Sequence, residues 1–244
     1  MTNYDSVEGL IIRVYENNPT DKVILIINKE GEKYTLLAKN IKSSTGKRLQ
    51  LAVIGNLVKI KFVKGYSLPL LTDINVINEF ISWKKDFKGM MYLQLMLEII
   101  NFFTFEDNPE PESYYLIEEI LLQDVNRAEY LLGIFTLKLL QLTGNLPELS
   151  KDNRTNENIT SENARLDLDG IGYVKDNGTK YLDKDDRIYK VQRYLIENDI
   201  KTSLKINLGN EESKKMLNIQ LNWVETVIDK EIKSRQVLRD MGFL

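Results

Sequence analysis

Residues 22–39 read Lys-Val-Ile-Leu-Ile-Ile-Asn-Lys-Glu-Gly-Glu-Lys-Tyr-Thr-Leu-Leu-Ala-Lys. Two short runs, 22–28 and 33–39, are rich in apolar and β-branched residues, and they flank a Gly-containing turn at 29–32. This pattern predicts a β-hairpin. Working outward, 7–15 and 57–64 predict further strands, and 67–73 predicts a fifth. Five strands within 80 residues, expected to be antiparallel and without helical crossovers, indicate a small OB-like barrel.

After residue 80 the apolar period changes from two to about 3.6, which predicts helices. We expect helices at 89–103, 112–123, about 127–143, about 184–198 and about 211–238. The 127–143 helix is expected to begin after Asn126 and to end at Gly144. Residues 148–165 are polar and predict a loop, and Asn177-Gly178 predicts a second hairpin between 172–175 and 179–182.

These patterns predict an α+β chain in three parts. An N-terminal five-stranded OB-like barrel occupies 1–80. An α-helical domain comprises 81–147 and 183–244. A small cysteine-free insert, polar and carrying the hairpin, fills 148–182.

Composition narrows the chemistry. The 244 residues include no Cys and no His, which excludes disulfides, a thiol nucleophile and Cys-ligated zinc, and removes the commonest general base. No Gly-rich phosphate loop or Ser nucleophile elbow is present. We therefore expect a protein that is not an enzyme and needs no cofactor or metal.

The longest stretch free of charged residues, 49–58, is too short to span a membrane, and the N-terminus does not have the pattern of a secretory signal. We expect a cytoplasmic protein with no membrane partner.

The net charge of −3 conceals a basic segment. Residues 29–64 carry nine Lys and Arg against two Glu, which is the footprint of a polyanion site. Alternation places Lys59 and Lys61 on one face of their strand, and Lys33 and Lys39 on one face of theirs. If these strands are neighbours, they form a positive wall that the loop at 42–48 extends. The predicted DNA-binding residues are Lys33, Lys39, Lys42, Lys47, Arg48, Lys59, Lys61, Lys64 and Tyr66, with Lys233 and Arg235 as a second patch on the last helix.

The ordered set of motifs resembles the RecO family of bacterial recombination mediators. The resemblance covers nearly the whole chain, and its motifs lie at 8–13, 31–39, 47–49, 62–69, 71–73, 144–149 and 232–235. It implies an OB-fold on a helical domain, binding of single- and double-stranded DNA, strand annealing, and recombinase loading in the RecF pathway. It also implies RecR and the C-terminal tail of single-strand-binding protein as partners. Many members carry a four-cysteine zinc module where this chain has its insert.

Two other functions remain open from the residues alone. The barrel could serve as a protein-interaction adaptor, in which case complexes would be insensitive to salt and no annealing would occur. The chain could also be an enzyme that uses carboxylates and lysines, such as a magnesium-dependent nuclease.

Overall fold

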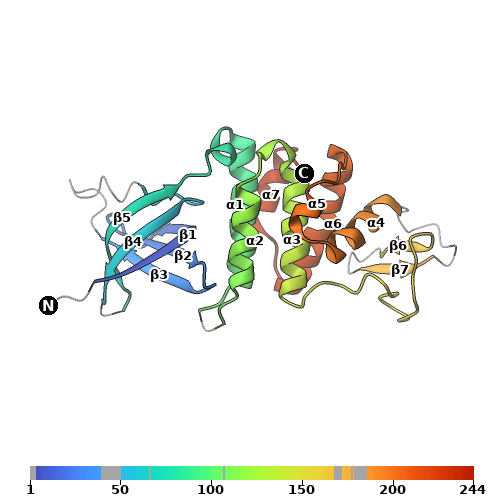
Figure 1. The fold of residues 1–244 in the computed structure, drawn as a ribbon, viewed down its shortest axis with the longest axis horizontal. Coiled ribbons are helices and arrows are strands. Elements are labelled where there is room, and N and C mark those ends of the chain that lie inside the picture. Colours follow the sequence, from blue (N-terminus) through green and yellow to red (C-terminus); the bar gives the residue numbers. More distant parts are fainter. Residues whose placement is uncertain are drawn as a thin grey trace. The chain divides into compact units, whose positions relative to one another are not determined.

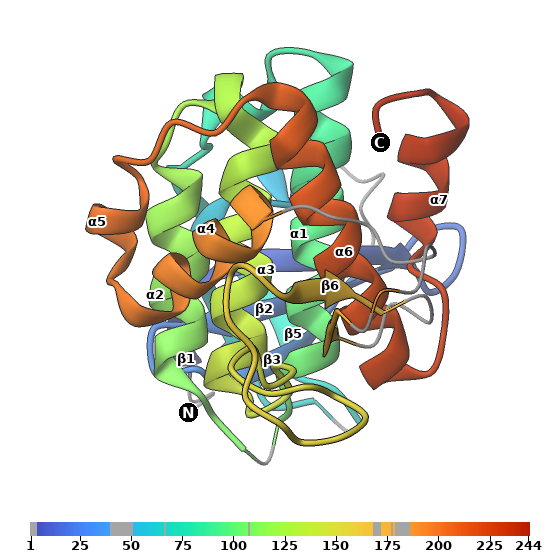
Figure 2. The same cartoon turned by 90° about the vertical axis from the view of Figure 1, so that its right-hand side faces the viewer.

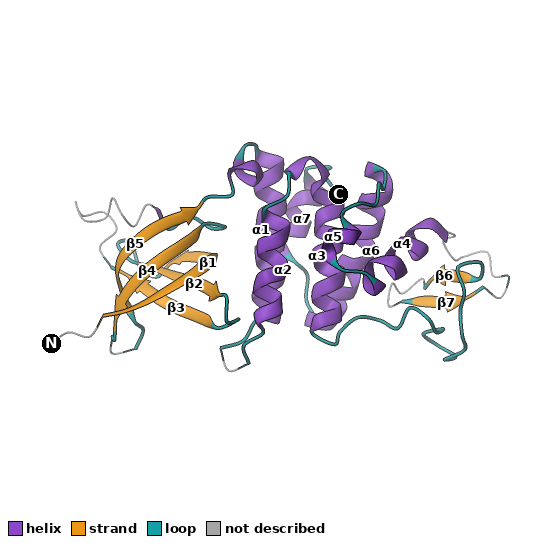
Figure 3. Ribbon diagram, in the orientation of Figure 1, coloured by secondary structure: helices purple, strands orange, loops and turns teal. Residues whose placement is uncertain are grey.

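The computed structural model describes residues 4–39, 51–65, 67–106, 108–167, 172–176, 178 and 186–244. By spatial contacts the chain divides into two units, Met1–Asp124 and Val125–Leu244. The first unit contains a β-barrel and two helices, and the second contains the other helices and a two-stranded sheet (Figures 1 and 3). The boundary lies beyond residue 80 because the first two helices pack against barrel strands.

The barrel is closed and its strand order is β1-β2-β3-β5-β4. Its strands are β1 (Tyr4–Glu16), β2 (Lys22–Asn28), β3 (Lys33–Ala38), β4 (Leu57–Val63) and β5 (Leu70–Asn78). Neighbouring strands are antiparallel except β3 and β5, which pair in parallel through Leu37 and Leu70. This architecture confirms the predicted OB-like barrel, and it corrects the expectation that every strand pair is antiparallel.

Strand β2 is buried on both faces, which explains its unbroken apolar sequence. Ile24 and Ile26 point into the barrel core, together with Ile11 of β1 and Ile60 of β4. The alternate β2 residues face outward but are also buried, because helix α2 covers this side of β2 while helix α1 packs on β1. The outer surface of β1 and β2 is therefore an interface with helices.

Helices α1 (Phe87–Phe103) and α2 (Pro111–Leu121) complete the first unit. Asp86 begins α1 by accepting a hydrogen bond from the Gly89 N–H at 2.7 Å. A short 3₁₀ turn, Ile81–Lys84, links β5 to α1. Its buried Trp83 donates from Nε1 to the Leu121 carbonyl at 3.1 Å and so joins this turn to the end of α2.

The second unit is built on α3 (Ala128–Leu142), which is buried on nearly every side. Helix α3 packs against α6 (Asn210–Ile228) and α4 (Asp186–Glu197), as Figure 2 shows. The remaining helices are α5 (Ile200–Ser203) and α7 (Lys233–Asp240). The expected cap Asn126 is not the N-cap of α3, because a 3₁₀ turn, Val125–Arg127, precedes the helix.

The long C-terminal helix expected at 211–238 is two helices. Helix α6 ends at Ile228. The residue after it, Asp229, has a φ of 51° in the left-handed region, and α7 begins at Lys233. Neither Gly nor Pro marks the break, so the helical period continued through it in the sequence. The turn allows α7 to place Ser234, Arg235 and Leu238 in the core.

The insert has its own hydrogen-bonded framework. Strand β7 (Tyr173–Lys175) pairs with β6 (Ala164–Leu166), which lies at the end of the segment expected to be a loop. The strand expected at 179–182 lies outside the described residues. The side chain of Asp152 is buried and accepts backbone N–H bonds from Arg154, Thr155 and Lys175 at 2.6–2.8 Å. Arg154 pairs with Asp167, and Arg165 pairs with Asp176, so ion pairs hold a segment that contains no cysteine.

Candidate nucleic-acid interface

The exposed lysines of the barrel follow the alternation of β4. Val58, Ile60 and Phe62 belong to the barrel core, whereas Lys59 and Lys61 are exposed on the outer surface. The two cations therefore share a face as expected.

The strand order separates the two lysine-bearing strands. Strand β5 lies between β3 and β4, so the expectation that these strands are neighbours is wrong. Strands in a sheet are about 4.8 Å apart, which puts β3 and β4 about 10 Å apart across β5. A single continuous wall of lysines from two adjacent strands does not form.

The basic residues meet instead around the start of β5. Leu70 pairs with Leu37 of β3 and also with Val63 of β4. Lys39 lies two residues beyond Leu37, and Lys64 directly follows Val63. Lys39, Lys61 and Lys64 are exposed and have no hydrogen bond or ion pair to any residue that the structure describes. The ends of β3 and β4 thus present three open cations on either side of β5.

Lys59 is exposed but already paired. Its Nζ lies 2.7 Å from Oε1 of Glu8, and about half of the lysine side chain remains accessible. The hydrogen bond and charge of Lys59 lower the pKa of Glu8. Because this pair lies on the surface and is screened by solvent, a phosphate can compete with the carboxylate for this lysine.

Lys33 does not belong to an open surface. Its Nζ lies 3.3 Å from the carbonyl oxygens of Asn101 and Thr104, at the C-terminal end of α1. Burial lowers the pKa of this half-buried amine. A lysine that binds the unpaired carbonyls of a helix end stabilises the helix. The structure therefore assigns Lys33 to packing between β3 and α1, which contradicts its expected role.

Arg235 is also a structural residue. Only 1% of its side chain is exposed, and it forms an ion pair with Glu225 of α6. It also donates to Oδ1 of Asn222 at 2.6 Å and to the carbonyl of Asn218 at 3.2 Å. The expectation that Arg235 contacts DNA is wrong, because the break before α7 turns this residue inward. Lys233, two residues earlier, is exposed.

Four of the predicted residues, Lys42, Lys47, Arg48 and Tyr66, lie outside the described residues. Lys39 is the last described residue before the segment that contains the first three.

One exposed pair was missed by the sequence reasoning. The guanidinium carbon of Arg13 lies 5.3 Å from the ring centre of Tyr15 on β1. Both side chains are exposed and share a face because they are two residues apart. The alternation of β1 could have identified this pair, which combines a cation with an aromatic ring as single-stranded nucleic-acid sites do.

Among the described residues, no cluster of three or more Asp and Glu side chains is placed to hold a metal ion. Over the same part of the chain, no helix combines the length and apolar character that crossing a bilayer requires.

Comparison with known proteins decides the family. The family model described as "Recombination protein O C terminal" matches residues 84–236, which is more than half of the chain. The chain belongs to the RecO family. The matched range begins at the end of the 3₁₀ turn before α1 and extends into α7, so it includes the cysteine-free insert.

Full-length RecO relatives extend the match to the barrel. A protein from Symbiobacterium thermophilum named "DNA repair protein RecO" is 20% identical over 96% of both chains. A protein of the same name from Clostridium acetobutylicum is 24% identical over 94% of this chain and 95% of its own length. One from Listeria innocua is 24% identical over 97% and 94%. These matches confirm the resemblance of this chain to the RecO family over nearly its whole length.

Proposed function

We propose that this RecO-family protein binds single- and double-stranded DNA without breaking covalent bonds, anneals complementary strands and helps to load recombinase in the RecF pathway. The observation that carries DNA binding is the group of open cations, Lys39, Lys61 and Lys64, around the start of β5. Lys59 and the basic loop residues Lys42, Lys47 and Arg48 extend this proposed site, with Tyr66 as a stacking residue. Lys33 and Arg235 are not part of it.

The physical mechanism is counterion release. Each lysine that replaces a condensed cation on a phosphate gains free energy from the ion that it releases. Two strands that lie on one positive surface repel each other less, so complementary bases can meet. Lys233 on α7 remains a second, weaker proposed contact.

A fluorescence anisotropy titration with a labelled oligonucleotide tests DNA binding. With five or six phosphate contacts, log K should fall with log[salt] with a slope of about −4 for a single strand. Lys61→Glu should weaken binding and make this slope shallower. Lys85→Glu is the matched control, because it makes the same charge change at an exposed residue outside the barrel strands. Equal affinities for both variants would rule out the proposed barrel site.

The later steps need their own assay. Complementary labelled strands should anneal faster with the protein, both when the strands are naked and when they are coated with single-strand-binding protein. We further propose that RecR and the C-terminal tail of single-strand-binding protein are partners and that the protein associates with the nucleoid. A pull-down with single-strand-binding protein lacking its tail tests the second partner, since that truncation should abolish capture.

A specific observation favours the adaptor alternative. The exposed apolar side chains Ile77, Ile81, Phe87 and Met90 follow one another from the end of β5 into α1. Exposed apolar groups of this kind are common at protein interfaces. A salt-insensitive protein complex together with no strand annealing would establish this function instead.

A further inference from the structure

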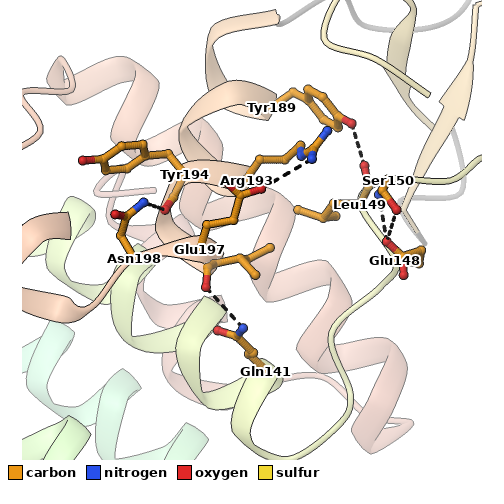
Figure 4. Close-up of polar contacts among 10 residues, drawn as sticks. Gln141, Glu148, Leu149, Ser150, Tyr189, Arg193, Tyr194, Glu197 and Asn198 are labelled. Atoms are coloured by element: carbon orange, nitrogen blue, oxygen red, sulfur yellow. Dashed lines mark hydrogen bonds and ion pairs between the residues drawn. The ribbon is translucent and has the colours of Figure 1, made fainter. Parts of the chain in front are cut away.

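A hollow lies on the second unit, far along the chain from the barrel lysines. Its volume is about 400 Å³, which is within the range of ligand sites, about 300–1,000 Å³. Helix α4 forms one wall, and Thr160 and Ser161 of the insert form the other. We call it the α4 hollow. Figure 4 shows the α4 residues that line it, among them Tyr189, Arg193, Tyr194 and Glu197.

The hollow contains an anchored cation. The Tyr189 hydroxyl donates to the Leu149 carbonyl at 2.6 Å, and the proximity of this hydroxyl to Arg193 raises the pKa of Arg193. Arg193 also lies 3.4 Å from Glu197, and 39% of its side chain is exposed (Figure 4). The guanidinium is therefore held in place and still accessible to a ligand.

Other groups with free hydrogen-bonding capacity surround Arg193. Lys190, one helical turn earlier, is exposed and has no partner among the residues that the structure describes. The hydroxyls of Thr160 and Ser161 likewise have no hydrogen bond within the described ranges. Tyr194 completes the lining with a ring that is 41% exposed. Two cations, two hydroxyls and an accessible ring thus line one hollow.

This combination favours a nucleotide over a peptide. The guanidinium, ammonium and hydroxyl groups are donors suited to a phosphodiester, and a tyrosine ring stacks on any base. Among the described residues that line the hollow, the large apolar groups are the rings of Tyr189 and Tyr194, and no Leu, Ile, Val or Met is present, so the lining suits base stacking better than the aliphatic anchors of a peptide. The carboxylate of Glu197 opposes an anion. Hydrogen bonds from Ser150 and, less strongly, the charge of Arg193 lower the pKa of Glu148, so a second carboxylate lies within electrostatic reach of this cation.

We propose that the α4 hollow binds one nucleotide of a DNA strand, with Lys190 and Arg193 on the phosphate and Tyr194 stacked on the base. The inference rests on the proposed DNA binding and adds a second contact that does not use the barrel lysines. A protein that anneals strands gains from such a contact because it can hold DNA at two places at once.

Four variants of the full chain test the proposal in the anisotropy titration. Lys190→Gln should make the salt slope shallower by about 0.7, the value of one single-strand phosphate contact. Tyr194→Ala should weaken binding about tenfold, whereas Tyr194→Phe should keep wild-type affinity because stacking needs only the ring. Glu197→Gln should tighten binding about threefold, because a competing carboxylate is removed. A gain of affinity cannot result from misfolding.

The control is Lys201→Gln, which removes an exposed cation on α5 that does not line the hollow. It should leave the affinity unchanged. If Lys190→Gln, Tyr194→Ala and Glu197→Gln also bind like the wild type, the proposal is overturned.

Crosslinking separates this inference from the proposed function. An oligonucleotide that contains 5-bromodeoxyuridine is irradiated with the protein, and crosslinked peptides are identified by mass spectrometry. Crosslinks within residues 186–197 support the hollow, even if none form on the barrel. Crosslinks confined to the barrel leave the proposed function intact and overturn the hollow. No DNA binding by the wild type overturns both. Binding of an Asp-rich fluorescent peptide that Lys190→Gln abolishes, with DNA binding unchanged, would show that the hollow holds an acidic peptide instead.

Discussion

Replacing Arg235 with Met removes the guanidinium that joins α7 to α6 and keeps most of the side-chain volume. The wild-type residue pairs with Glu225 and donates to Asn218 and Asn222 from a nearly fully buried position. Breaking a buried ion pair by removing one partner costs about 3–5 kcal/mol. Because 21% of the Glu225 side chain is exposed and can be hydrated, we expect the lower end, about 3 kcal/mol.

Urea unfolding measures this cost in the second unit. The chain has two Trp residues, Trp83 in the first unit and Trp223 in the second, so a W83F background leaves Trp223 as the reporter. With a slope of about 2 kcal/mol per molar urea, R235M should lower the midpoint by roughly 1.5 M. K233Q, at an exposed neighbouring position, should change the free energy of unfolding by less than about 0.5 kcal/mol.

A double-mutant cycle isolates the pair. E225Q combined with R235M should cost about 2 kcal/mol less than the sum of the single variants, because one broken pair is counted twice in that sum. The reasoning is refuted if R235M costs less than about 1 kcal/mol with an unchanged slope. It is also refuted if folded R235M binds DNA more weakly than the wild type while K233Q does not.

Three more perturbations test the fold. Gly31→Ala should destabilise the first unit by roughly 3 kcal/mol or more, measured by thermal unfolding. The reason is that Gly31 has a φ of 79° and that a Cβ would lie 2.3–2.6 Å from backbone atoms of Glu110. An unchanged unfolding midpoint would contradict this packing. At Asp152, burial raises the pKa of the carboxyl group, but three backbone N–H bonds lower it more, so the net pKa is lowered. The ionised carboxylate therefore stabilises the insert above about pH 4, the ordinary pKa of Asp. This stabilisation is lost as the pH falls through the lowered pKa. Asp152→Asn should therefore cost about 1–3 kcal/mol at pH 7 and speed hydrogen exchange of the Lys175 amide, whereas unchanged exchange would exclude Asp152 as the support of β7. Burial lowers the pKa of Lys84 from an ordinary value of 10.5 to about 8. Between pH 8 and pH 10.5 the lysine is therefore protonated more fully in the unfolded chain than in the folded one. The free energy of unfolding should rise with pH across this range. Lys84→Met should reduce this rise in urea midpoints, and identical pH profiles for variant and wild type would refute the assignment.

The barrel was predictable because its signals are local. Apolar residues alternate along β4, and β-branched runs flank the turn at 29–32, so the pattern within each segment specifies strands and their faces. The unbroken run 22–28 was correctly predicted as a strand. Its burial on both faces was not predictable, because it depends on α1 and α2 packing on the outside of the barrel.

The candidate site was predicted less completely. Exposure of Lys39, Lys59, Lys61 and Lys64 followed from alternation and charge. The fate of Arg235 did not, because the turn at Asp229 interrupts a helical period that continues in the sequence. The α4 hollow was also missed, since its two walls come from segments about thirty residues apart in the chain.

The sequence by itself determined the five strands, the change to helices after residue 80, the absence of thiol chemistry and the face on which each strand carries its lysines. These properties depend on the period and composition of short segments. The tertiary structure alone decided that β5 separates β3 from β4 and that Lys33 binds the end of α1. It also decided that Arg235 is buried and forms an ion pair with Glu225. Such features depend on which distant segments come together, and that is decided by packing and pairing free energies summed over the whole unit rather than by any local pattern.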